Sequence, residues 1–285
     1  MLNVLSIDVE DYWSIFSRDW LGIEAEPSDA VVKNTEWFLC VLAEHDVKAT
    51  FFILGEVAEK FPSLIKEIAE QGHEIASHGF YHRQIFKLSE EDFRREIAES
   101  KRLLEDITGR AVTGHRAPAF SIMPQTKWAL QVLAEEGFRY DSSVYPISGK
   151  RYGWPGFSKD ICKIDLPGGQ SFVEVPMSTV TVFGKTFPAA GGGYIRHFPY
   201  SLTKWAIKHI QKNRPAIVYI HPYEIDTEPG AFDMKHFSCT EKLKVKTFHK
   251  LQQRNKDTMA EKLTKLLDEF DFTTIAKVIN KTVTE

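Results

Sequence analysis

Side chains that bind metals and transfer protons occur in three short clusters, and each cluster follows an apolar run. An acidic cluster begins at Asp8, a histidine pair begins at His78, and a further histidine, His221, follows the apolar residues 216–220. Short apolar runs of this kind are typical of buried strands. Because α/β folds place their sites beyond the carboxyl ends of their strands, we expect the three clusters to lie near one another.

The histidine pair is the first candidate for a metal site. His78 and His82 are four residues apart, so both rings can face one ion from a single turn. Two imidazoles and one carboxylate leave coordination positions of a divalent metal open, as a catalytic site requires. Such an ion polarises a carbonyl group and acidifies a bound water. The alternative, two surface histidines at this spacing by chance, is less consistent with the acids and the third histidine at other strand ends.

Each remaining polar residue has a structural alternative. The acids at Asp8 could merely cap a helix, and His221 could be a core histidine. Arg116 could be a surface arginine, but a short apolar stretch precedes it and Pro118 stiffens the chain after it. Glu224 could orient His221 or could be a solvated loop acid, and the residues alone favour neither.

The whole chain has the properties of one globular domain spanning residues 1–285. Of its 285 residues, 43% are hydrophobic and 26% are charged, and the net charge is -3, which gives no sign of a nucleic-acid partner. No apolar run is long enough to span a membrane. The first residues lack the pattern of a signal peptide and the cysteines lack the pattern of a disulfide framework, so we expect a cytoplasmic location. Nothing in the sequence specifies an oligomeric state.

Strand and helix patterns alternate along the first half of the chain. Strands are predicted at residues 2–7, 48–54, 73–78, 216–220 and 272–275, and helices at 28–45, 56–71, 90–108, 124–137, 200–212 and 240–270. Strands that alternate with helices imply a parallel sheet with crossover helices. Residues of about 144–198 are rich in glycine, proline and aromatic residues, and we expect an irregular excursion there with strands at 172–175 and 179–183 that could form a hairpin. About 240–285 is predicted to be a helical C-terminal extension.

Taken in order, these pieces resemble the polysaccharide deacetylase family, also called the NodB-homology or carbohydrate esterase 4 family. Its five motifs resemble residues 6–11, 77–82, 116–118, 141–143 and 219–221. Further stretches, including Gly-Gly-Gly-Tyr at 191–194 and Tyr-Ile-His-Pro-Tyr-Glu at 219–224, resemble the branch associated with exopolysaccharide and exosortase gene clusters. The resemblance covers nearly the whole chain and implies an α/β fold, a distorted (β/α)7-type barrel.

The resemblance also implies residue roles. Asp8 would be the catalytic base, Arg116 would orient it, and His221 would be the general acid. A divalent metal, expected to be Zn with Co, Ni or Mn as alternatives, would be held by Glu10, His78 and His82.

Substrate contacts are expected from Pro118 and from Asp141, which belongs to a motif that lines the groove. Tyr145 is one of several aromatic residues near the clusters that could stack on a sugar ring, the others being Trp13, Tyr152, Trp154 and Phe157. The alternative for each aromatic residue is a place in the core.

The chain departs from the common family pattern at two positions. Val9 stands where the first motif usually has a second aspartate, so the ligand carboxylate must come from elsewhere. Side chains at i and i+2 of a strand share a face, which favours Glu10 beside Asp8, with Asp11 as the alternative ligand if the strand breaks at Val9. Ala119 replaces a common aromatic residue after Pro118, so Phe120 could reshape the groove wall.

The predicted function is therefore removal of N-acetyl groups from an amino sugar, in a polysaccharide or in its biosynthetic intermediate, with release of acetate. The first alternative is a metal-dependent amidohydrolase acting on a small non-sugar amide. A closed pocket would favour that alternative, and a groove open at both ends would favour a polymer. A non-catalytic sugar-binding protein is disfavoured because both the expected base and the expected acid are present.

Overall fold

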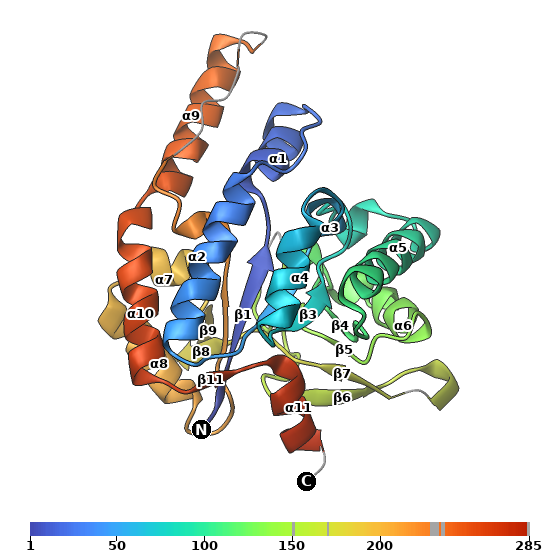
Figure 1. The fold of residues 1–285 in the computed structure, drawn as a ribbon. Coiled ribbons are helices and arrows are strands. Elements are labelled where there is room, and N and C mark those ends of the chain that lie inside the picture. The colour runs from blue at the N-terminus through green and yellow to red at the C-terminus, as the bar shows by residue number, and fades with distance from the viewer. Residues whose placement is uncertain (150–151, 170, 229–233, 235–236, 284–285) are drawn as a thin grey trace.

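A curled, mostly parallel sheet forms the centre of the protein, with helices packed around its outer face (Figure 1). The computed structural model describes residues 1–149, 152–169, 171–228, 234 and 237–283. The strands of the main sheet are β1 (Asn3–Val9), β2 (Thr50–Ile53), β3 (Glu74–Ser77), β4 (Gly114–His115), β5 (Tyr140–Asp141), β6 (Cys162–Asp165), β7 (Ser171–Glu174), β10 (Ile217–Ile220) and β11 (Phe272–Thr273).

The order of strands in space is β10-β1-β2-β3-β4-β5-β7-β6, and β11 also pairs with β1. Neighbouring strands are parallel except for the antiparallel pair β6 and β7. The carboxyl ends of β1, β3, β4 and β10 therefore lie at one edge of the sheet. The residues after those strands are the clusters that the sequence singled out.

Alternation along β1 determines which side chains enter the curl of the sheet. Leu5, Ile7 and Val9 belong to the large core between sheet and helices. Val4 belongs to a second cluster inside the curl, together with residues of β2, β5 and β10. Because successive side chains of a strand point to opposite faces, Asp8 lies on the same inner face as Val4.

The helices are α1 (Tyr12–Phe16), α2 (Ala30–Glu44), α3 (Gly55–Lys60), α4 (Pro62–Glu70), α5 (Glu90–Thr108), α6 (Trp128–Glu135), α7 (Gly192–His197), α8 (Tyr200–Ile210), α9 (Cys239–Gln253), α10 (Met259–Glu269) and α11 (Ile275–Val283). The helix predicted at 90–108 is confirmed, with Ser89 accepting a hydrogen bond from the Asp92 backbone N–H and Gly109 closing the end at φ 64°. Among the described residues, none of the helices combines the length and the apolar character needed to cross a bilayer.

Two predicted helices are each divided in the structure. The segment 56–71 contains α3 and α4, because Pro62 cannot continue the preceding helix and instead begins the next one. The segment 240–270 contains α9 and α10, and Asn255 between them has a left-handed backbone with φ 60°. Figure 1 shows α9 extending away from the sheet beside α1, and Phe16 and Val245 pack together where these segments meet.

The predicted excursion contains real strands. Residues 172–175 lie largely in β7, and residues 179–183 lie largely in β8 (Thr179–Val182), which forms an antiparallel hairpin with β9 (Lys185–Pro188). The two predicted strands do not pair with each other, since β7 pairs with β6 and β8 pairs with β9. Residues 150–151 and 170 of the excursion lie outside the described residues.

Candidate active site

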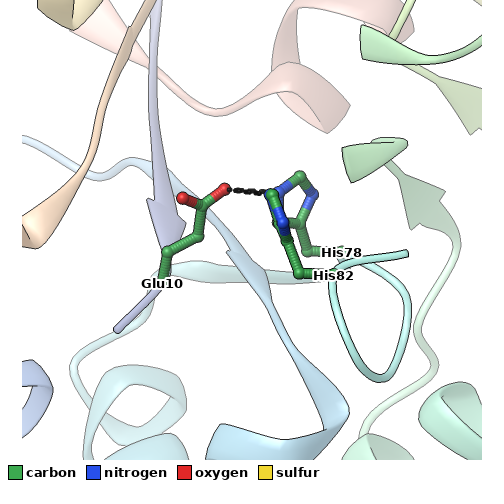
Figure 2. Close-up of side chains that lie close together, drawn as sticks. All are labelled: Glu10, His78 and His82. Carbon is green, nitrogen blue, oxygen red and sulfur yellow. Dashed lines mark hydrogen bonds and ion pairs between the residues drawn. The ribbon is translucent and has the colours of Figure 1, made fainter. Parts of the chain in front are cut away.

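Glu10, His78 and His82 form a compact group of potential metal ligands (Figure 2). The Glu10 Oε1 atom is 2.9 Å from His78 Nε2 and 3.1 Å from His82 Nε2. Burial would raise the pKa of Glu10, but the charges of His82 and His221 and hydrogen bonds from His78 and His82 hold it well below its usual value. Glu10 is thus an ionised carboxylate facing two imidazole nitrogens.

The orientation of His78 also fits a metal ligand. Its Nδ1 atom is 2.8 Å from the backbone carbonyl oxygen of Arg116. A ring that donates from Nδ1 to a carbonyl presents the lone pair of Nε2, and ligating histidines are commonly held in this way. Ligand atoms around a tetrahedral Zn ion are about 3.3–3.6 Å apart for bonds of about 2.0–2.2 Å. The ligand atoms of the three residues all lie within 4.8 Å of one another, so the residues present fit a divalent ion after small movements.

A tight turn brings Glu10 to this position. The Glu10 N–H donates to the Asp8 carbonyl at 2.9 Å, so the chain turns at Val9 as the strand ends. Asp11 points elsewhere and caps α1, accepting hydrogen bonds from the Ser14 N–H at 2.8 Å and the Ser28 hydroxyl at 2.6 Å. Asp11 is therefore a helix cap outside the ligand triad, which corrects the alternative ligand assignment.

Arg116 is completely buried and binds Asp8. Its Nη1 atom donates to Asp8 Oδ1 at 2.6 Å and to the Ser6 hydroxyl at 2.9 Å. Its other nitrogens donate to the Ser142 carbonyl and hydroxyl at 2.9 and 3.0 Å, and the guanidinium lies 4.1 Å from the centre of the Phe52 ring. A buried guanidinium needs this number of partners. The surface-arginine alternative is wrong.

His221 completes the site from β10. Its Nε2 atom is 4.0 Å from Asp8 Oδ2 and 3.9 Å from Glu10 Oε2. Its ring stacks on Tyr223, with centroids 4.9 Å apart. Burial by itself would lower the pKa of His221. The charges of Glu10, Glu224 and Asp8 outweigh that effect and raise the pKa from 6.5 to about 9. The side chain is suited to holding a proton at neutral pH.

Glu224 is the partner of His221 and not a solvated acid. It is 2% exposed, and one of its carboxylate oxygens accepts from the His221 backbone N–H at 3.3 Å and lies 3.7 Å from Nδ1. A Cβ atom on Gly192 would meet this carboxylate. The run of three glycines at 191–193 thus permits α7 to pack closely against Glu224.

The third motif, residues 116–118, and the two residues after it form part of the wall of the site cavity. Ala119 and Phe120 both have positive φ angles, 52° and 53°, which are uncommon for residues with a side chain and often occur at functional sites. Ala117, Ala119 and Phe120 line a cavity of about 190 Å³ together with Asp8, the ligand triad and His221. Phe120 does form part of this wall.

Two expected substrate-contacting residues are buried behind the wall. Asp141 is completely buried and accepts hydrogen bonds from Ser143 and from His115 Nδ1, at 2.7 Å for His115. Tyr145 is also completely buried and stacks on Tyr152. The prediction that they line the groove is wrong, because β5 and the loop after it direct these side chains into the protein interior and not into the site cavity.

Asp141 instead supports the third motif through Ser143, whose hydroxyl accepts from the Ala117 N–H at 2.7 Å. Pro118 is buried as well and packs toward the turn at Gly79, and the alanines on either side of it face the cavity. Tyr152 lines the cavity, whereas Trp154 and Phe157 pack against the core.

Further cavities share wall residues with the site cavity. Two of them, of about 400 and 150 Å³, include Glu10, Tyr12 and Tyr223 in their walls, and the site cavity also includes Glu10 and Tyr223. Trp13 lines the larger one. Hollows therefore lie on more than one side of Glu10 and Tyr223.

Sequence reasoning assigned no role to Ser6 or Ser142, although both bind Arg116. Serine in a buried strand is a weak signal, because a hydroxyl can also bind its own backbone. A buried arginine beyond a strand end needs oxygen acceptors around it. That need was the signal in the sequence that pointed to hydrogen-bond partners for Arg116.

Comparisons with known proteins divide the chain near residue 141. Residues 24–140 match the family model described as polysaccharide deacetylase, and residues 142–280 match a domain of unknown function, DUF3473. A peptidoglycan-N-acetylglucosamine deacetylase of Bacillus cereus is 42% identical over 120 residues, which is 42% of this chain and 41% of that protein. A chitooligosaccharide deacetylase of Sinorhizobium fredii is 40% identical over 81 residues, 28% of this chain and 38% of that protein. The matches thus span less than half of either relative.

Solved structures confirm the predicted barrel-type fold. A structure from Mycobacterium smegmatis named as a polysaccharide deacetylase aligns with a TM-score of 0.65 at 17% identity, over 99% of this chain and 89% of that one. Puue allantoinase aligns with a TM-score of 0.61 at 16% identity, over 97% and 88% of the two chains. At these identities the likeness establishes the fold alone. The local sequence matches go further: residues 24–140 are similar in sequence to polysaccharide deacetylases, and the curated relatives carry that activity in their names.

Proposed function

We propose that this protein is a metal-dependent carbohydrate N-deacetylase that hydrolyses the acetamido group of an amino sugar to acetate and a free amine. The observation that carries the proposal is the arrangement of Asp8 and His221. They face each other across 4.0 Å, beside the Glu10, His78 and His82 triad. The curated relatives, whose names state deacetylase activity on peptidoglycan and chitooligosaccharides, support it.

The residues of the chain divide the proton transfers between them. When bound at the triad, a divalent ion polarises the acetamido carbonyl and lowers the pKa of a coordinated water. Asp8 accepts a proton from the attacking water, and the oxygen free to do so is Oδ2, because Oδ1 is held by Arg116. His221 donates a proton to the departing amine nitrogen. The backbone N–H of Ala119 is the proposed donor to the developing oxyanion.

The proposed metal is Zn, with Co, Ni and Mn as alternatives, because two imidazoles and a carboxylate accept several first-row ions. The proposed substrate is an N-acetylated saccharide, as a polymer or as a biosynthetic intermediate of one. The neighbouring cavities that share Glu10 and Tyr223 support a substrate longer than one sugar. The sequence resemblance to the exopolysaccharide-associated branch supports the same substrate class, and a cytoplasmic location remains a prediction.

The alternative is hydrolysis of a small non-sugar amide. The overall fold suits it equally, since an allantoinase shares this fold. The neighbouring cavities and the sequence matches favour the saccharide.

The test is acetate release from N-acetylglucosamine oligomers by metal-stripped protein, with and without added Zn or Co, beside His78→Ala. We expect metal-dependent acetate from the unmodified protein and none from the variant. The rate should fall on both the acidic and the alkaline side, since the base must be ionised and the acid protonated. Stoichiometric metal binding without acetate from any oligomer would favour the small-amide alternative. Absence of both metal binding and acetate would contradict the ligand assignment.

A further inference from the structure

Large apolar side chains are exposed together on one outer surface of the protein. It is formed by the β8–β9 hairpin and helices α7 and α8, which lie together at the lower left of Figure 1. We call it the hairpin surface, and its exposed residues are Phe183 (100%), Phe187 (47%), Phe198 (41%), Leu202 (42%) and Trp205 (44%). An apolar cavity of about 280 Å³ is lined in part by the last four of these side chains. Exposed apolar groups gathered in this way usually mark an interaction surface.

The tip of the hairpin has a residue that the turn itself disfavours. Val182 pairs with Lys185, so Phe183 and Gly184 form a two-residue loop with φ angles of 49° and 74°. Two positive φ angles define the type I′ turn, whose favoured residues are Asn-Gly and Asp-Gly. A bulky aromatic residue is costly in this conformation. Because the side chain is fully exposed, it makes no compensating contact in the described structure, which indicates a role in binding.

The same segment is basic. Between Glu174 and Glu224 the sequence contains no aspartate or glutamate but six lysines and arginines: Lys185, Arg196, Lys204, Lys208, Lys212 and Arg214.

Three of these, Lys185, Lys208 and Lys212, are exposed, and no ion pair to them is found among the described residues. Of the acids on neighbouring segments, Glu269 of α10 pairs with Lys204 and also attracts Lys208. Asp160 is the acid that acts on Arg214. The hairpin surface therefore combines exposed apolar groups with exposed positive charge.

We propose that the hairpin surface docks on a lipid bilayer that contains anionic lipid. Phe183 and Trp205 would enter the boundary between headgroups and acyl chains, and the lysines would contact the headgroups. On α8, Leu202, Trp205 and His209 follow helical spacing along one edge, and the Trp205 and His209 rings stack at 5.5 Å. A second copy of this chain fits less well, because a symmetric contact would bring lysines against lysines.

Docking of this kind would place the membrane next to the site. Tyr194 lines the apolar cavity, and its hydroxyl is 3.1 Å from the hydroxyl of Tyr152, which lines the site cavity. A saccharide attached to a bilayer would therefore have its sugar close to the triad. This consequence rests on the proposed function, whereas docking itself does not.

The test is flotation of the intact protein with vesicles of phosphatidylcholine alone or of equal parts phosphatidylcholine and phosphatidylglycerol. We expect binding to the mixed vesicles that weakens in high salt. Phe183→Ser and Trp205→Ser should each lower the partition coefficient at least about ten-fold. Leu243→Ser, at a residue that is 67% exposed on α9, is the matched control and should leave binding unchanged.

Two double charge-reversal variants separate the contribution of lipid charge to vesicle binding from that of apolar contact. Lys208→Glu with Lys212→Glu should abolish the preference for anionic vesicles, whereas Lys244→Glu with Lys246→Glu on α9 should retain it. Failure of the unmodified protein to bind mixed vesicles, or equal binding by Phe183→Ser, would overturn the proposal. So would an oligomer that dissociates in Phe183→Ser. Acetate release from a free oligosaccharide should be unchanged in Phe183→Ser, which keeps this test independent of the proposed activity.

Discussion

Glu10 and Asp11 are adjacent carboxylates in opposite surroundings. Glu10 faces two imidazoles and its pKa is depressed, whereas burial, partly offset by hydrogen bonds from Ser28 and Ser14, raises the pKa of Asp11. We predict that Glu10→Gln weakens metal binding at least about 100-fold, since even the loss of an outer-shell partner costs 10–100-fold. Asp11→Ala should instead keep the metal and lose about 1 kcal/mol of stability through the helix cap. Metal titration and urea unfolding of both variants check this. Loss of metal binding by Asp11→Ala, with metal binding retained by Glu10→Gln, would contradict it.

His221 has a pKa that its neighbours determine. Burial lowers the value, but Glu10, Glu224 and Asp8 together raise it from 6.5 to about 9 in the protein without metal. A pKa that is higher in the folded state gives stability that is complete below about pH 6.5 and is lost as the pH rises through about 9. We predict that an NMR titration of the metal-free protein finds the ring still protonated at pH 7, and that Glu224→Gln lowers the pKa. A ring that is neutral at pH 7 would refute this.

At the scale of elements, the β8–β9 hairpin allows a prediction about its turn. Phe183→Asn places a favoured residue at the first position of a type I′ turn, where the native φ is 49°. We predict an increase in stability of about 0.5–1 kcal/mol by urea unfolding, of the size typical when a residue matches its backbone conformation. Thr181→Asn, within β8, is the control and should destabilise, because asparagine is disfavoured in strands. Destabilisation by Phe183→Asn would mean that Phe183 has a packing role.

The elements predicted correctly are those with a strong local pattern. The apolar runs gave β1, β2 and β10, and the capped segment gave α5. The two-residue strands β4 and β5 have no periodicity to detect, and they form because the neighbouring strands present free hydrogen-bonding edges. The inward direction of Asp141 and Tyr145 depends on how β5 and its loop enter the sheet, which a motif does not record. The triad was predictable because its residues follow strand ends directly.

At the scale of the whole molecule, the family boundary near residue 141 does not separate two structural units. β1 carries Asp8 and pairs with β2 on one side and with β10, from the second matched segment, on the other. We predict that residues 1–141 alone do not unfold cooperatively, because β1 lacks β10 and the core lacks its C-terminal helices. Circular dichroism melting of this fragment beside the whole chain checks it. A sharp transition in the fragment would show an independent N-terminal unit.

The position of β1 has a consequence for synthesis. Val4 pairs with Ile217, and Asn3 pairs with Phe272, so β1 acquires two of its neighbours from segments that are synthesised much later. Contacts this distant in sequence form slowly, and until they form the apolar face of β1 is exposed. A nascent chain that has not reached residue 217 carries every proposed metal ligand but lacks the proposed acid. Completion of the site therefore waits until synthesis has passed β10, and translation that pauses before β10 would produce chains prone to aggregation.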